Sequence, residues 1–99
     1  MIRHIVITNF DAKLCSDCVA LLEKTRPFIN QIPGILSYQI FPNASKYVPK
    51  GVISAGVEIH FKDEAALQVF MSHPKHYEAN ATFEAYLANP PYMVLTHKI

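Results

Sequence analysis

The segment Val52–Phe61, with the sequence VISAGVEIHF, carries the clearest secondary-structure pattern of the 99-residue chain. Every second residue from Ile53 to Phe61 is apolar, whereas the intervening positions, from Ser54 to His60, are mixed. A period of two residues is typical of a β-strand with one buried face. The pattern therefore predicts a strand in a sheet that packs one side against the core.

Three other segments are rich in β-branched and aromatic residues, and they predict strands over residues 2–10, 35–41 and 92–98. A polar loop over residues 42–51 joins the second of these strands to Val52–Phe61. The chain thus supplies four strands.

Helical patterns lie between the strands. Apolar residues from Cys18 to Ile29 recur with a period of about 3.6, which predicts a helix with Ser16 or Asp17 as its N-cap. Pro27 is expected to bend or shorten this helix, because proline lacks an amide hydrogen and crowds the preceding turn.

Two further helices are expected before the last strand. Asp63 is the predicted N-cap of a helix that ends at Met71, since the residue before Pro74 is disfavoured in helical conformation. The next helix is expected over residues 75–88, ended by the sequence Asn-Pro-Pro at 89–91.

The element order is therefore β-α-β-β-α-α-β, the ferredoxin-like arrangement with its second helix broken in two. In this α+β topology the helices lie on one side of a four-stranded antiparallel sheet. We expect a single domain over residues 1–99.

The first strand has apolar residues on both faces, with Ile5 and Ile7 on one and Val6 and Phe10 on the other. The last strand does the same. A sheet that is apolar on both faces needs a cover on each, and a chain of this length offers only one helical layer. We therefore expect a homodimer formed through the open sheet face, which makes an α+β barrel.

Composition excludes several classes of function. The net charge is +1 and no Lys/Arg cluster exceeds two residues, which argues against nucleic acid or anionic lipid as a partner. No apolar run approaches the roughly 20 residues of a membrane span. The opening residues lack the pattern of a signal peptide, so we expect a cytoplasmic protein.

His76 is the first candidate for chemistry. On the helix expected over 75–88 it shares one face with Asn80, Phe83 and Leu87, and the two apolar residues should turn that face toward the sheet. Burial lowers the pKa of histidine and favours the neutral imidazole that a general base requires. The structural alternative is a core histidine bonded to a backbone carbonyl.

His4 shares a strand face with Val6 and Phe10. If that face looks toward the helices, His4 and His76 line one cavity together with Asn80 and Phe70. If it looks toward a partner sheet, the two imidazoles do not meet, and alternation alone does not choose between the faces. A purely structural histidine is again the alternative.

Five tyrosines add candidate hydroxyl groups. Tyr86 lies one position from the inward helix face, and Tyr47 lies in the long loop, which is able to fold over a pocket. Either is a candidate to orient a substrate carbonyl, although such tyrosines more often pack with one edge in water. The others are Tyr38, Tyr77 and Tyr92.

Neither a metal site nor a redox centre is favoured. His73 and His76 are separated by Pro74, which interrupts the helix that would align them as ligands. Cys15 and Cys18 form a Cys-x-x-Cys pair, but Cys18 falls on the apolar helix face, where a thiol behaves as a small hydrophobe. We expect no cofactor.

Three motifs resemble one known family, the stress-responsive A/B barrel domain. They are IRHIV at residues 2–6, IPGI at 32–35 and FMSHPKH at 70–76, the last of which contains the family's His-Pro-x-His signature. The resemblance covers essentially the whole chain. It implies a dimeric α+β barrel.

One branch of that family, a plant polyketide cyclase, implies a reaction. In that branch a first-strand histidine and the second histidine of His-Pro-x-His share a pocket, and the latter is the general base of an aldol-type ring closure. These positions correspond to His4 and His76 here. A tyrosine that assists the base falls on Phe70, which has no hydroxyl group.

Two functions remain. The first is a cofactor-independent lyase, cyclase or isomerase that acts on a small apolar carbonyl compound, with a monooxygenase on the same barrel as a close variant. His76 is then the base, His4 and Asn80 polarise or orient the substrate, and the wall consists of Phe70, Phe83 and Leu87. The second is a non-catalytic dimer that binds a small ligand or protects against stress.

Overall fold

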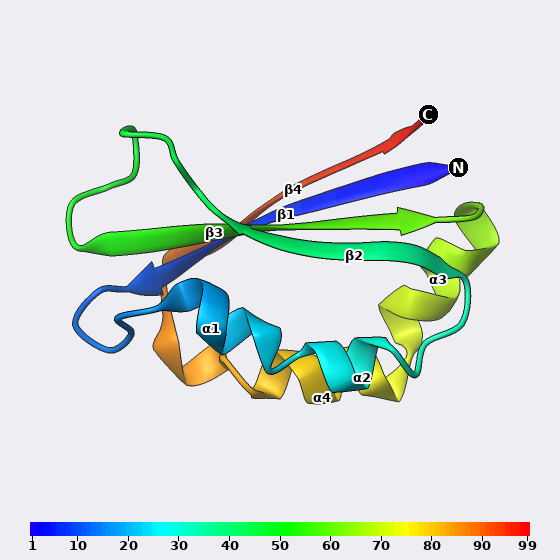
Figure 1. Ribbon diagram of the computed structural model, residues 1–99, viewed down its shortest axis with the longest axis horizontal. Coiled ribbons are helices and arrows are strands. Elements are labelled where there is room, and N and C mark those ends of the chain that lie inside the picture. Colours follow the sequence, from blue (N-terminus) through cyan, green and yellow to red (C-terminus); the bar gives the residue numbers. More distant parts are fainter.

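The computed structural model describes residues 1–99 and contains the four-stranded antiparallel sheet that the sequence predicts. The strands are β1 (Ile2–Asp11), β2 (Ile35–Pro42), β3 (Val52–Phe61) and β4 (Leu87–Lys98), in the spatial order β2-β3-β1-β4. All the helices lie on one side of the sheet (Figure 1). They are α1 (Cys18–Glu23), α2 (Arg26–Ile29), α3 (Glu64–Ser72), α4 (Pro74–Ala81) and the 3-10 turn η1 (Glu84–Tyr86).

Side-chain caps fix where three of these helices begin. The carboxylate of Asp17 accepts from the Ala20 amide at 3.0 Å, and that of Asp63 accepts from the Ala66 amide at 2.9 Å. These contacts satisfy amides that have no partner within the helix. Nδ1 of His73 caps α4 by accepting from the amide of Lys75 at 3.0 Å. His73 thus acts as a helix cap.

The helix expected over 18–29 is divided into α1 and α2, with Pro27 in the first turn of α2. A proline is tolerated there because that amide needs no helical acceptor. None of the helices is long and apolar enough to cross a membrane.

The prediction of a helix over residues 75–88 is wrong for the second half of that segment. The α-helix ends at Ala81, the Thr82 hydroxyl donates to the carbonyl of Ala79 at 2.7 Å, and the chain continues through η1 into β4. Pro90 and Pro91 lie inside β4. An edge strand tolerates them because it pairs on one side only, and the β1–β4 register is irregular beside these residues.

The face of β1 that carries His4 looks toward the helices. His4, Thr8 and Phe10 are buried there, beside the inward face of β3. The core thus lies between the helical layer and this side of the sheet. Its apolar members are mainly Phe10, Leu22, Ile29, Ile59, Phe61 and Phe70.

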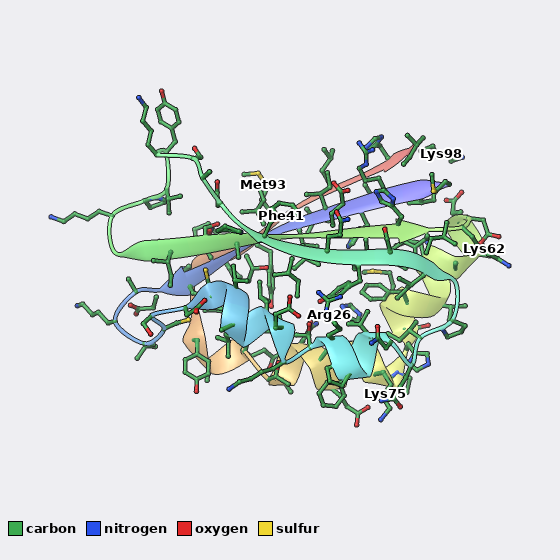
Figure 2. The ribbon with its side chains drawn as sticks, in the orientation of Figure 1. Arg26, Phe41, Lys62, Lys75, Met93 and Lys98 are labelled. Carbon is green, nitrogen blue, oxygen red and sulfur yellow. The ribbon has the colours of Figure 1, made fainter.

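The other face of the sheet carries exposed apolar side chains. Met93 and Leu95 on β4 are 67% and 58% exposed, and they lie beside Ile7 and Ile5 of β1. Phe41 of β2 lies on the same face, where its ring covers Gly56 so closely that a Cβ there would overlap it. Figure 2 shows Phe41 and Met93 on the side of the sheet away from the helices. This surface is called the outer sheet face below.

Two glycines adopt positive φ, Gly34 before β2 with φ of 85° and Gly51 before β3 with φ of 80°. A Cβ added at Gly34 would lie 2.5 Å from the Cβ of Ala66 in α3, whereas at Gly51 it would meet nothing within 4 Å. Gly34 is therefore required both by its backbone conformation and by the close approach of α3.

The variants Gly34→Ala and Gly51→Ala separate these two effects. We expect Gly51→Ala to lower the free energy of unfolding by about 1 kcal/mol, the cost of a left-handed alanine. Gly34→Ala should cost about 3 kcal/mol, because overpacking is added. Chemical denaturation measures both, and Ala66→Gly should recover part of the Gly34→Ala loss. Equal losses at the two positions would show that the contact with Ala66 is unimportant.

Candidate active site

A cavity of about 250 Å³ lies between the helices and the inward face of the sheet. Its wall is mostly apolar, and all four strands and every α-helix contribute to it. The apolar residues include Val6, Leu22, Ile29, Val57, Ile59, Phe70, Ala79 and Phe83. Polar groups are few. They are the side chains of His4, Thr8, Thr25, Tyr38, His76, Asn80 and Tyr92.

The cavity opens at the edge strand β4. Three of its lining residues, Met71, Tyr92 and Val94, are exposed to solvent. Tyr92 and Val94 lie on the inward side of β4, paired with Thr8 and Val6 of β1. A small molecule therefore has a path into the cavity past β4.

His4 is held from the strand side. Its Nδ1 lies 2.7 Å from the hydroxyl oxygen of Thr96, the residue opposite it on β4. Burial lowers the pKa of His4 from its ordinary value of 6.5, and the proximity of His76 lowers it further. Both imidazoles contact the ring of Phe70, so they lie at the same part of the cavity wall.

Phe70 of α3 lies against both imidazoles. Its ring stacks on His76 with 4.1 Å between the ring centroids and an angle of 28° between the planes. It meets His4 edge-on at 6.2 Å and Phe61 at 5.2 Å. This aromatic group replaces water around the imidazoles, and desolvation of this kind opposes their protonation.

His76 lies in the first turn of α4, directly after the end of α3. Its Nε2 is 3.4 Å from Nδ2 of Asn80, and its Nδ1 is buried without a hydrogen-bond partner. Burial lowers the pKa of His76, while the carbonyl groups of Met71 and Phe70 raise it part of the way back. The imidazole is therefore neutral at pH 7.

The structure brings together five of the sequence-derived candidates. His4, His76, Asn80, Phe70 and Phe83 all line the cavity. They come from β1, α3, α4 and the turn that follows α4, so the topology joins residues that are far apart in the chain.

Three other candidates do not reach this cavity. Leu87 begins β4 opposite Phe10 and packs against the core, because α4 ends before it. Tyr86 lines a different hollow, beside Cys15 and Lys24. Tyr47 is 86% exposed in the loop between β2 and β3, which extends past the end of the sheet (Figure 1).

Two of the five candidate tyrosines, Tyr38 and Tyr92, do line the cavity, whereas Thr25 was not a candidate. The hydroxyl groups of Tyr38 and Thr25 lie 2.7 Å apart at the cavity wall. Tyr38 pairs with Ile59 and so points inward, but the register of β2 shifts between Ile35 and Ser37. In the sequence, the alternation of Tyr38 and Ile40 indicates that Tyr38 points inward. Nothing in the sequence indicates its contact with Thr25.

No group of three or more His, Cys, Asp or Glu side chains is placed to hold a metal ion. The two cysteines, Cys15 and Cys18, are buried free thiols. Burial raises the pKa of Cys18, and the neighbouring Cys15 adds to the effect. The protonated thiol is a poor nucleophile.

The fold and the cavity define a class of protein, an α+β domain of ferredoxin-like topology that encloses two imidazoles beneath its helices. The family model described as the stress responsive A/B barrel domain matches residues 2–94. The chain therefore belongs to this family, and the resemblance of its motifs is confirmed. Among curated proteins, none matches the chain.

Solved structures share the fold. At3g17210 from Arabidopsis thaliana is 19% identical with a TM-score of 0.79, covering 100% of this chain and 95% of that one. A dimeric ferredoxin-like protein of unknown function from Thermobifida fusca is 20% identical with a TM-score of 0.73, covering 99% and 90%. A protein described as an antibiotic biosynthesis monooxygenase is 16% identical with a TM-score of 0.74, covering 100% and 98%. At these identities the likeness shows the fold alone.

The lowered pKa values of His4 and His76 predict how stability depends on pH. Below pH 6.5 the unfolded chain binds protons at these positions before the native state does. The free energy of unfolding should therefore decrease as the pH falls from 6.5 toward the folded pKa values. The double variant His4→Gln/His76→Gln should show a flatter dependence in urea titrations between pH 7 and about pH 5.

The variant Thr8→Val is the control, because it changes a buried side chain that does not titrate, on the same face of β1 as His4. It should keep the slope of the native protein. A double variant with an unchanged slope would mean that the two imidazoles are not desolvated.

Proposed function

We propose that the protein is a small homodimeric barrel that transfers a proton on a small, apolar carbonyl compound without a cofactor. His76 is the general base. The observation that supports this most directly is its neutral imidazole at the wall of an open, mostly apolar cavity, with a second imidazole near it. Lyases, cyclases and isomerases of carbonyl compounds all use such a proton transfer.

The surroundings of His76 assign a role to each ring nitrogen. Nδ1 is buried, and the carbonyl groups of Met71 and Phe70 at the end of α3 favour the protonated ring. We place the proton of the neutral ring on Nδ1, because the carbonyl oxygens of Met71 and Phe70 favour an N–H over a lone pair beside them. Nε2 then carries the lone pair, and the amide of Asn80 lies beside it at 3.4 Å.

His4 complements this base. When the Thr96 hydroxyl donates to Nδ1 of His4 across 2.7 Å, the proton of the ring resides on Nε2. Nε2–H is then a donor for the oxygen of a bound carbonyl group. Such a donor stabilises the negative charge that develops on oxygen when a neighbouring carbon loses its proton.

The step balances within these groups. Nε2 of His76 takes a proton from the carbon next to the carbonyl, and the electron pair of the C–H bond moves to form an enolate. His4 and the amide of Asn80 stabilise the enolate oxygen. The imidazolium then returns its proton to carbon or to a leaving oxygen, which restores the neutral base.

The proposal also includes the dimer interface and the cellular compartment of the protein. The outer sheet face, with Met93 and Leu95 exposed, is proposed to pack on the same face of a second copy. A cytoplasmic location agrees with two free, unpaired cysteines, since secreted proteins of this size commonly form disulfides.

Non-catalytic ligand binding is the second candidate. It is favoured by Phe70, which stacks on His76 and supplies no hydroxyl group to assist the base. In this case the same cavity holds a small apolar molecule and no proton is transferred.

Deuterium exchange into the methyl group of acetophenone tests the reaction without knowledge of the natural substrate. The native protein should accelerate exchange, measured by NMR in heavy water, beyond the same concentration of free imidazole. His76→Gln should lower the rate by roughly 10²-fold, the usual contribution of a general base. His60→Gln, on the outer sheet face, should retain it.

Two results would decide against the enzyme. One is full exchange activity in folded His76→Gln. The other is binding of acetophenone by the native protein with no exchange above that of imidazole, which would favour the non-catalytic dimer.

The dimer is tested by a matched pair of substitutions on β4. Leu95 and Val94 are 58% and 54% exposed and point to opposite faces of the sheet. Leu95→Asp should give a monomer in sedimentation equilibrium, because it buries a charge at the proposed interface. Val94→Asp should remain dimeric, and dissociation of Val94→Asp alone would place the interface on the other side.

A further inference from the structure

The hydroxyl group of Tyr38 is a further polar group on the wall of the cavity. Tyr38 pairs with Ile59 on β3, and Ile59 pairs with His4 on β1. The three residues form one row across the inward face of the sheet. Tyr38 and His4 are thus separated by two strand spacings, about 10 Å, with Ile59 as the floor between them.

The hydrogen bonds fix the direction in which Tyr38 donates. Thr25 has one hydroxyl proton, and it donates this proton to the carbonyl of Leu22 at 2.6 Å. The contact of 2.7 Å between Thr25 and Tyr38 must then use the proton of Tyr38. The oxygen of Tyr38 is left with lone pairs only.

Two features hold this arrangement in place. Thr25 is almost completely buried, so bulk water does not compete for its hydroxyl group. Arg26 donates from Nη1 to the backbone carbonyl of Tyr38 at 2.9 Å, and its guanidinium lies 5.3 Å from the centre of the Tyr38 ring. Glu23 in turn accepts from Arg26 at 2.8 Å and 3.1 Å.

We propose that Tyr38, fixed by Thr25 as a hydrogen-bond acceptor, selects ligands that carry a hydroxyl group at the end opposite their carbonyl. This rests on the proposed function, which places the carbonyl group at His4 and His76. The ligand class is then a hydroxyl-bearing carbonyl compound that spans the row from Tyr38 to His4. A benzene ring with the two groups in para positions has this form.

The selection has a physical cause. A ligand hydroxyl that donates to Tyr38 satisfies a lone pair of its oxygen on a mostly apolar wall. A ligand with a methyl group at that place leaves the oxygen of Tyr38 desolvated without a donor, which costs binding free energy. Tyr38 is therefore a specificity-determining residue, whereas the imidazoles carry the chemistry.

Two probes of similar size test this, 4-hydroxyacetophenone and 4-methylacetophenone. The dissociation constant of each is measured by NMR titration, with the ring signals of His76 as the reporter of binding in the cavity. The native protein should bind the hydroxyl probe about tenfold more tightly. Tyr38→Phe should lose this preference, because the hydroxyl probe loses its acceptor and the methyl probe no longer leaves the oxygen of Tyr38 unpaired.

Substitutions of Thr25 separate the direction of the hydrogen bond from the mere presence of Tyr38. Thr25→Val keeps the shape but removes the acceptor, so the Tyr38 proton becomes free to point into the cavity. The preference should then move from 4-hydroxyacetophenone toward 4-methoxyacetophenone, which only accepts. Thr25→Ser retains the hydroxyl group and should keep the native preference.

The outcomes distinguish this inference from the function on which it rests. Equal affinity of the native protein for both probes, with His76 signals shifted by each, would overturn the role of Tyr38 and leave the proposed cavity function intact. Failure of both probes to perturb His76 would overturn both. A preference that survives in Tyr38→Phe would also refute the inference.

Discussion

The packing of Phe70 against two imidazoles is the interaction on which the site depends. Its ring is buried against His4, His76 and Phe61 at once, so it joins β1, β3 and the junction between α3 and α4. An aromatic ring there excludes water and lowers the pKa of both histidines. It offers them no hydrogen bond, so the polar partners of the two rings are Thr96 at His4 and Asn80 at His76.

The site is also shaped by where the helical layer ends. Helices pack over β2 and β3, whereas the exposed lining residues of the cavity lie on the edge strand β4 and at the end of α3. The other face of the same sheet carries the apolar residues proposed to bind a second copy. On this proposal, ligand access and association use opposite faces of the sheet.

Much of the fold follows from the sequence because the signals are local. The alternation in Val52–Phe61, the cap at Ser16 or Asp17, the cap Asp63 and the interruption expected at Pro27 each depend on a few neighbouring residues. The region after Ala81 was predicted wrongly, since Pro90 and Pro91 are breakers in most contexts but are tolerated in an edge strand. Residues 87–91 belong to a strand only because they continue the segment that pairs with β1, and this pairing is not visible in the local sequence.

The site was less predictable than the fold. His4, His76 and Asn80 could be singled out by residue type, helix spacing and family motif, and they do line the cavity, although their roles remain predictions. The hydrogen bond between Tyr38 and Thr25 joins two elements, and no local pattern reports it. Tyr86 was expected at the cavity on the basis of a helix that ends earlier.

The most direct test of the central claim is ¹⁵N NMR of the His76 ring in histidine-labelled protein, followed from pH 8 to about pH 5. We expect a neutral ring with its proton on Nδ1 and a pKa below 6.5. A pKa above 6.5, or a neutral ring protonated on Nε2, would contradict the assignment of His76 as a base that faces the cavity.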